Sequence, residues 1–152
     1  MVQHPFSRLV YAVMVCSMLA FGVQALAQAQ PPNTATLLAR LSGASVVPPN
    51  ESEATGNLQA TLNRQTRVLS WTLTTKGLSS SPVGATFNGP AMPGDNAAVE
   101  VPLQAGQNLD RGTVTLTESQ IDDVMAGRWY VAVLTASRPD GEIRGQVMVA
   151  AK

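Results

Sequence analysis

The sequence predicts an all-β fold, an antiparallel sandwich or barrel, with one short helix near residues 118–126. From Thr36 onward, apolar and polar residues alternate with period two, as they do in strands that bury one face. The alternating segments are short, and loops rich in Pro, Gly and Asn separate them. This spacing of short strands favours antiparallel pairing over βαβ units.

The first 27 residues are predicted to be a secretory signal peptide. Arg8 precedes an uncharged apolar run, which ends at the small-x-small pattern of Ala25, Leu26 and Ala27. The run is shorter than the roughly 20 residues that span a bilayer, so a transmembrane anchor is the weaker alternative. We expect residues 28–35 to form a flexible leader and residues 36–150 to form a single domain. The chain is then exported, to the periplasm or the cell exterior, with no membrane span after cleavage.

Cleavage would remove His4 and Cys16, the single histidine and the single cysteine of the chain. A mature chain without them has no disulfide, no Cys- or His-dependent catalytic group and no His- or Cys-ligated metal. We therefore expect no cofactor and no enzymatic activity. Cleavage also removes Arg8, which leaves one more acidic than basic residue and no basic patch. Nucleic acid is not an expected partner.

Eight segments have the alternation of strands. We predict them at residues 36–44, 57–63, 68–76, 84–88, 98–103, 112–117, 128–136 and 142–150. In the third segment, Leu69, Trp71 and Leu73 point inward. Residues 129–134 are apolar at every position, which predicts a central strand.

One helix interrupts the strands. Thr117 and Gln120 have the spacing of a capping box, which satisfies two free backbone donors at the start of a helix. Ile121, Val124 and Met125 share one face of this helix, and Gly127 suits the left-handed position that follows its last turn. Asp122 and Asp123 lie early in the helix, and we interpret them as solvated side chains near the favourable end of its dipole.

The stretch GATFNGPA, residues 84–91, places Thr86 and Asn88 on one strand face and Phe87 on the other. Two neighbouring polar positions on one face could form a metal site or a catalytic pair. Neither position, however, carries a His, a Cys or a carboxylate.

Further polar residues could hold a ligand. Asp95, Asn96 and Glu100 offer oxygen atoms to calcium, but PGDN is first a turn sequence and the spacing matches no calcium-binding loop. Paired carboxylates can also cleave glycosides without a His. The mature chain has few aromatic residues for a sugar cleft, so a glycan-active enzyme is a poor alternative.

A row of polar residues follows the turn at Asp140 and Gly141. Glu142, Arg144 and Gln146 alternate with the apolar residues of the last strand. If those apolar residues face the core, the three polar side chains form an exposed row. We favour a structural interpretation, with ion pairs worth well under 1 kcal/mol. The alternative is a recognition face for a protein or an envelope polysaccharide.

Six motifs in order resemble the CHRD (chordin) domain family: LSGASVVPP, ATGNLQATLN, LSWTLTTKGLSS, ATFNGPAMPGDN, GTVTLTESQIDDVMAGRWYVAVLTA and GEIRGQV. The resemblance covers about residues 37–149, and GPA and GEIRGQ are its most specific parts. It implies an immunoglobulin-like sandwich of about seven to nine strands. The domain occurs repeatedly in chordin, which antagonises growth factors, and alone in exported bacterial proteins, so the resemblance implies a single-domain exported member.

The chain departs from the family pattern at several positions. Thr86 and Asn88 stand where relatives commonly have the histidines of AHIHGPA, and Leu134 stands where they have the His of VHT. Val46 replaces the Glu that usually precedes VPP. We therefore expect an exported, non-enzymatic binding or structural module whose family-type histidine site is absent. Its partner would be an unknown protein or envelope polysaccharide, and a divergent metal-binding or redox protein of the envelope is the alternative.

Overall fold

A computed structural model describes residues 33–151, in which eight antiparallel strands form one continuous, curled sheet. The elements in chain order are β1 (Thr34–Ser42), the short 3-10 helix η1 (Gly43–Ser45), β2 (Thr55–Asn63), β3 (Val68–Lys76), β4 (Pro82–Asn88), β5 (Val99–Gln104), β6 (Arg111–Thr115), α1 (Glu118–Met125), β7 (Trp129–Thr135) and β8 (Ile143–Val149). The predicted all-β, sandwich-like fold with one helix is confirmed. The predicted signal peptide, residues 1–27, and residues 28–32 of the leader lie outside the described residues.

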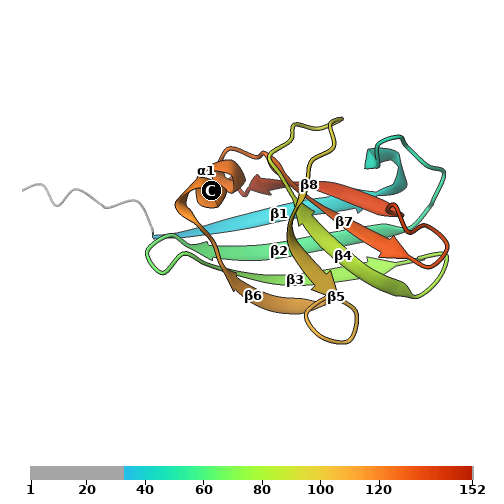
Figure 1. Ribbon diagram of the computed structural model, residues 1–152, viewed down its shortest axis with the longest axis horizontal. Helices are drawn as coiled ribbons and strands as arrows, with labels where there is room; N and C mark the ends of the chain where they lie inside the picture. The colour runs from blue at the N-terminus through green and yellow to red at the C-terminus, as the bar shows by residue number, and fades with distance from the viewer. Residues whose placement is uncertain (1–32, 152) are drawn as a thin grey trace, which may run out of the picture.

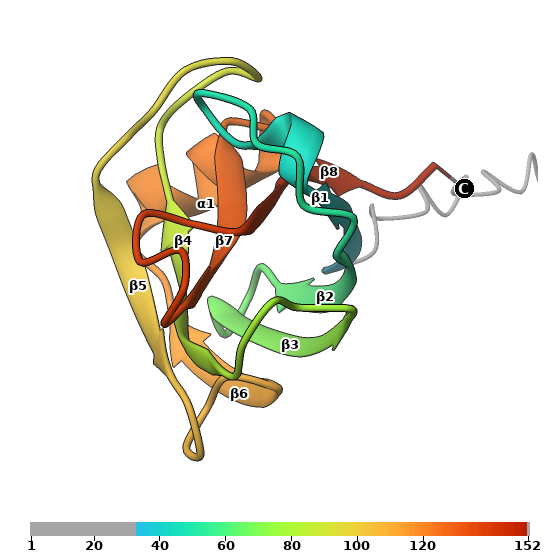
Figure 2. The same ribbon diagram turned by 90° about the vertical axis from the view of Figure 1, so that its right-hand side faces the viewer.

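The sheet curls so that two halves face each other, as the two layers of a sandwich do (Figures 1 and 2). The order across it is β5-β4-β7-β8-β1-β2-β3-β6, so β8 and β1 join the halves. These two strands pair at Leu37–Leu38 and again at Ser42. Between those points, Gly145 lies so close to the Arg40 carbonyl that a Cβ would overlap it. A glycine at this place in GEIRGQ lets the sheet fold over.

The core lies between the halves and is centred on three aromatic rings. Trp71 of β3 meets Phe87 of β4 edge-on, with ring centroids 5.5 Å apart, and Phe87 meets Trp129 of β7 at 6.0 Å. Leu69 and Leu73 are buried beside Trp71, which confirms the predicted inward set. The aromatic rings therefore connect one half of the sheet to the other.

The helix begins and ends as predicted. Thr117 Oγ1 accepts from the Gln120 backbone N–H, and the Gln120 side chain accepts from the Thr117 backbone N–H, which completes the capping box. Ile121 and Val124 are buried, and Met125 packs against the core. None of the helices in residues 33–151 is both long and apolar enough to cross a membrane.

Candidate functional site

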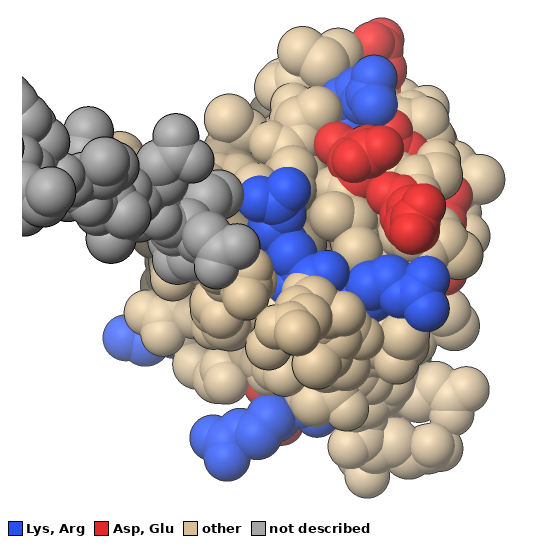
Figure 3. All heavy atoms as spheres, turned by 90° about the vertical axis from the view of Figure 1, so that its left-hand side faces the viewer, with Lys and Arg blue, Asp and Glu red and all other residues tan. Residues whose placement is uncertain are grey.

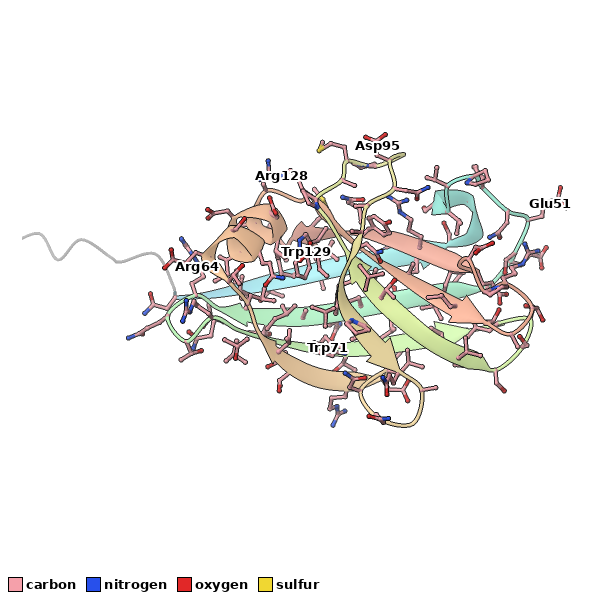
Figure 4. All side chains as sticks on the ribbon, viewed as in Figure 1. Glu51, Arg64, Trp71, Asp95, Arg128 and Trp129 are labelled. Carbon is pink, nitrogen blue, oxygen red and sulfur yellow. The ribbon has the colours of Figure 1, made fainter. Side chains whose placement is uncertain are left out.

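The candidate site lies on the outer face of β4, β7 and β8, because loops cover much of this face. Three loops, at residues 43–54, 89–98 and 136–141, fold over it. In Figure 4, Glu51 and Asp95 mark the first two of these loops, which lie at the upper right of the molecule. The polar row of β8 therefore lies beneath loops. Glu142 and Arg144 are 0% and 3% exposed, so the expectation of an exposed row is wrong.

Glu142 is a fully buried carboxylate held by hydroxyl and amide donors. Its Oε1 accepts from Ser52 Oγ and the Ser79 backbone N–H, each at 2.8 Å. Its Oε2 accepts from Ser79 Oγ at 2.8 Å and Thr135 Oγ1 at 2.7 Å. Burial by itself would raise the pKa of this carboxyl, but the hydrogen bonds from Thr135, Ser79 and Ser52 outweigh it and lower the pKa to about 2. Glu142 thus remains ionised and ties two loops to the end of β7.

Arg144 holds the second loop. One terminal nitrogen donates to Asn96 Oδ1 at 3.0 Å and the other to the Asp95 carbonyl at 2.6 Å. Its guanidinium lies 3.5 Å from the centre of the Tyr130 ring, a close cation–π contact. Burial lowers the pKa of Arg144, while Tyr130 and the Asp95 carboxylate act in the opposite direction. The group stays charged at neutral pH.

Gln146 completes the row. Its side-chain amide donates to the carbonyls of Ala91, at 2.9 Å, and Gly127, at 2.8 Å, and so joins the 89–98 loop to the end of α1. The three polar side chains of β8 therefore connect segments that are far apart in the sequence. The row, for which we favoured a structural interpretation over a recognition face, fixes the loops that cover it.

A cavity of about 210 Å³ lies beneath these loops. Its walls include Thr86, Asn88 and Leu134, together with Val46 from the first loop. Thr86, Asn88 and Leu134, which stand at the family histidine positions, thus line one cavity, although Leu134 does not lie beside Asn88. All four positions at which the chain departs from the family pattern line the same cavity.

The register shows how these side chains are arranged. Thr86 is opposite Ala132 and Asn88 is opposite Tyr130, whereas Leu134 is opposite Gly84. Leu134 is thus a diagonal neighbour of Thr86, and four residues of β7, about 13 Å, separate it from the position opposite Asn88. Thr86 Oγ1 donates to Asn88 Oδ1 at 2.6 Å.

Three oxygens of the residues that we considered for calcium have other partners. The Asp95 carbonyl and Asn96 Oδ1 accept from Arg144, and Glu100 Oε2 accepts from the Gln120 side chain at 2.7 Å. Two of these three oxygens are thus bound to a guanidinium. Within residues 33–151, no three His, Cys, Asp or Glu side chains lie close enough to hold a metal ion.

A larger depression of about 520 Å³ lies between α1 and the β2–β3 turn. It is lined by exposed side chains of both charges, among them Arg64, Arg67 and Asp122, and Figure 3 shows acidic and basic groups side by side on this face. Asp122 and Asp123 lie in the second half of the helix, not near its start, and Asp123 forms an ion pair with Arg128. The expected dipole benefit is therefore wrong, while Asp122 is a solvated side chain as expected.

Tyr130 has a role that we did not predict from its local sequence. It lies on the outer face, where its hydroxyl accepts from the Ala97 N–H at 3.1 Å and donates to the Ala97 carbonyl at 3.3 Å. A signal was present, since residues 129–134 are apolar at every position. A strand that is apolar on both faces needs a cover on both, and here loops provide the second cover.

The model of the CHRD domain matches residues 37–147. The chain belongs to the CHRD domain family. Family members are non-catalytic modules. No curated protein and no solved structure matches the chain. The most specific family motif beside GEIRGQ is GPA, and here Gly89 of that motif packs against the Trp129 indole so closely that a Cβ would overlap it.

Proposed function

We propose that the protein is an exported, non-enzymatic CHRD module that binds a partner through the three loops over β4, β7 and β8. The observation that carries this proposal is the polar row of Glu142 and Arg144, both buried, and the half-buried Gln146, which together hold these loops on a rigid sheet. Loops held by a rigid scaffold are where binding residues concentrate. The non-catalytic character of the family supports the same function.

The chemistry of the buried charges also supports binding over catalysis. A general acid or base near neutral pH needs a pKa close to the working pH. The pKa of Glu142 lies at about 2, and its carboxylate is hydrogen-bonded to the hydroxyl groups of Ser52, Ser79 and Thr135 and to the Ser79 backbone amide. Arg144 cannot serve as a base, because a guanidinium does not lose its proton in proteins.

The loops suggest the chemistry of the partner. They expose four acidic side chains, Glu51, Glu53, Asp95 and Asp140, and the basic residue among them, Arg138, is half-buried. Met92 is 56% exposed on the same loops. Acidic loops with an apolar side chain fit a protein with a basic surface better than a neutral polysaccharide.

A pull-down from envelope extract tests this proposal. The double variant Glu51→Gln/Glu53→Gln should lose the partner, and raised salt should weaken the wild-type complex, because screening acts on exposed charges. The matched control is Glu118→Gln/Asp122→Asn, which removes two exposed acidic charges from α1, away from the loops. Equal recovery by both double variants would contradict the loop surface as the binding site.

Export is tested separately. N-terminal sequencing of protein recovered from the envelope or the medium should begin near Gln28, after cleavage at Ala27. Recovery of a chain that still begins with Met1 would contradict both the signal peptide and the loss of His4 and Cys16.

A further inference from the structure

The cavity beneath the loops has the size of a small-molecule site. Its volume is about 210 Å³. Sites for drug-sized ligands begin at roughly 300 Å³. An occupant would therefore be a compact molecule of few non-hydrogen atoms.

Much of the cavity wall is apolar. The 43–54 loop contributes Val46 and Val47, β5 contributes Val99, and Leu134 and Pro139 come from the end of β7 and the turn that follows it. Such a wall favours an apolar body over a sugar or another strongly hydrated molecule.

The neutral polar groups of the wall already have partners. Thr86 donates to Asn88, and the Asn88 amide donates to the Ala97 carbonyl at 3.2 Å. The Tyr130 hydroxyl is hydrogen-bonded to the same residue, Ala97. These groups shape the cavity, and a ligand would have to compete for them.

Arg144 differs from them. A guanidinium has five N–H donors, and the structure commits two of them to protein acceptors, both neutral. In the part of the chain that the structure describes, no carboxylate forms an ion pair with Arg144, although the Asp95 carboxylate lies near enough to raise the pKa of the guanidinium. A cation that is 3% exposed and faces a cavity is stabilised most by an anion that brings two acceptor atoms.

We propose that this cavity binds a small monocarboxylate with a compact apolar body, whose carboxylate is held by Arg144. The charge fixes one end of the ligand, and the valine, leucine and proline side chains accept the other. Asp140 also lines the cavity, and its exposed carboxylate repels anions, so a ligand with one negative charge is favoured over a ligand with two. This proposal concerns a small-molecule site and is separate from the proposed binding of a protein partner by the loops. Each proposal has its own probe and variants, so a negative result for one does not contradict the other.

Benzoate is the probe, and benzyl alcohol is its neutral counterpart of similar size. Calorimetry on the mature chain should show saturable benzoate binding with a stoichiometry of one. Benzyl alcohol should bind roughly tenfold to hundredfold more weakly, the range expected for loss of a charge-assisted hydrogen bond. NMR should show a benzoate-dependent shift of the Arg144 side-chain N–H signal.

Two variants separate ligand binding from folding. Arg144→Gln should reduce benzoate affinity at least about tenfold, provided that it folds. Ala132→Leu fills the cavity without changing Arg144 and should abolish binding, whereas Ala105→Leu, at an exposed turn position, should leave it unchanged. Equal affinity for benzyl alcohol, no saturable binding at millimolar benzoate, or unchanged binding by Ala132→Leu would overturn the proposal.

Discussion

Replacing Glu142 with Gln tests whether the buried carboxylate stabilises the loops through its charge. The amide oxygen can keep the hydrogen bonds from Ser52 Oγ and the Ser79 N–H, while the amide nitrogen faces Ser79 Oγ and Thr135 Oγ1. Hydroxyl groups can turn to accept instead of donate, so the amide nitrogen finds acceptors, but the O–H groups of Ser79 and Thr135 lose the acceptor that they have in the wild type. The substitution therefore removes the charge on the acceptor and the two hydrogen bonds that these hydroxyl groups donate to it.

The size of the effect follows from the pKa. A shift from the ordinary value of 4.5 to about 2 corresponds to roughly 3 kcal/mol of stability as an upper bound. Hydrogen bonds to charged groups exceed neutral ones by about 1–2 kcal/mol. We therefore expect Glu142→Gln to lower the free energy of unfolding by about 2 kcal/mol at pH 7.

The effect should depend on pH in a defined direction. Because the folded pKa of Glu142 is lowered, its stabilisation is fully present above the unfolded pKa of 4.5 and is lost as the pH falls toward about 2. Urea unfolding of wild type and variant should give a gap of about 2 kcal/mol at pH 7 that closes across this window. The Glu142→Gln variant should not show the loss of unfolding free energy that protonation of Glu142 causes in the wild type over this pH range.

The matched control is Glu53→Gln, at an exposed position close to Ser52 in the same loop. It should change the free energy of unfolding by no more than about 0.5 kcal/mol at any pH. A gap between wild type and Glu142→Gln that is the same at pH 7 and pH 3 would refute the assignment of the stabilisation to the carboxylate charge. So would equal effects of the two substitutions.

Two further predictions concern the core and the histidine positions. Trp71→Ala should lower the free energy of unfolding by about 3–5 kcal/mol, because Trp71 is buried at the centre of the core. Asp122→Ala should lower it by no more than roughly 0.5 kcal/mol. Thermal and chemical unfolding measure both effects, and the opposite ranking would contradict the strand register. Wild type should bind neither zinc nor copper tightly by calorimetry, and the combined change Thr86→His, Asn88→His, Leu134→His should create measurable affinity, since three imidazoles then face one cavity. Because Leu134 is distant from Asn88 along the strands, the affinity of the triple variant should be well below that of an ideal site. Tight stoichiometric metal binding by the wild type would contradict the interpretation that its metal site is absent.

The sequence by itself determined the local structure. Alternation placed β3 at residues 68–76 with Trp71 inward, and the spacing of Thr117 and Gln120 placed the start of the helix. It also placed Thr86 and Asn88 on one face and Phe87 on the other. These features depend on residues a few positions apart, because strand geometry and helix capping act over that distance.

The tertiary structure alone decided which faces are covered. The alternation of β8 separates Glu142, Arg144 and Gln146 from the apolar residues between them, but it does not reveal whether the polar side faces water. Three loops that are up to about ninety residues distant in the chain fold over this side, and their serine, asparagine and carbonyl groups satisfy the buried charges. Burial of a polar side chain depends on partners brought together by the whole fold, and so a local pattern predicts the face on which the residue lies but not its environment.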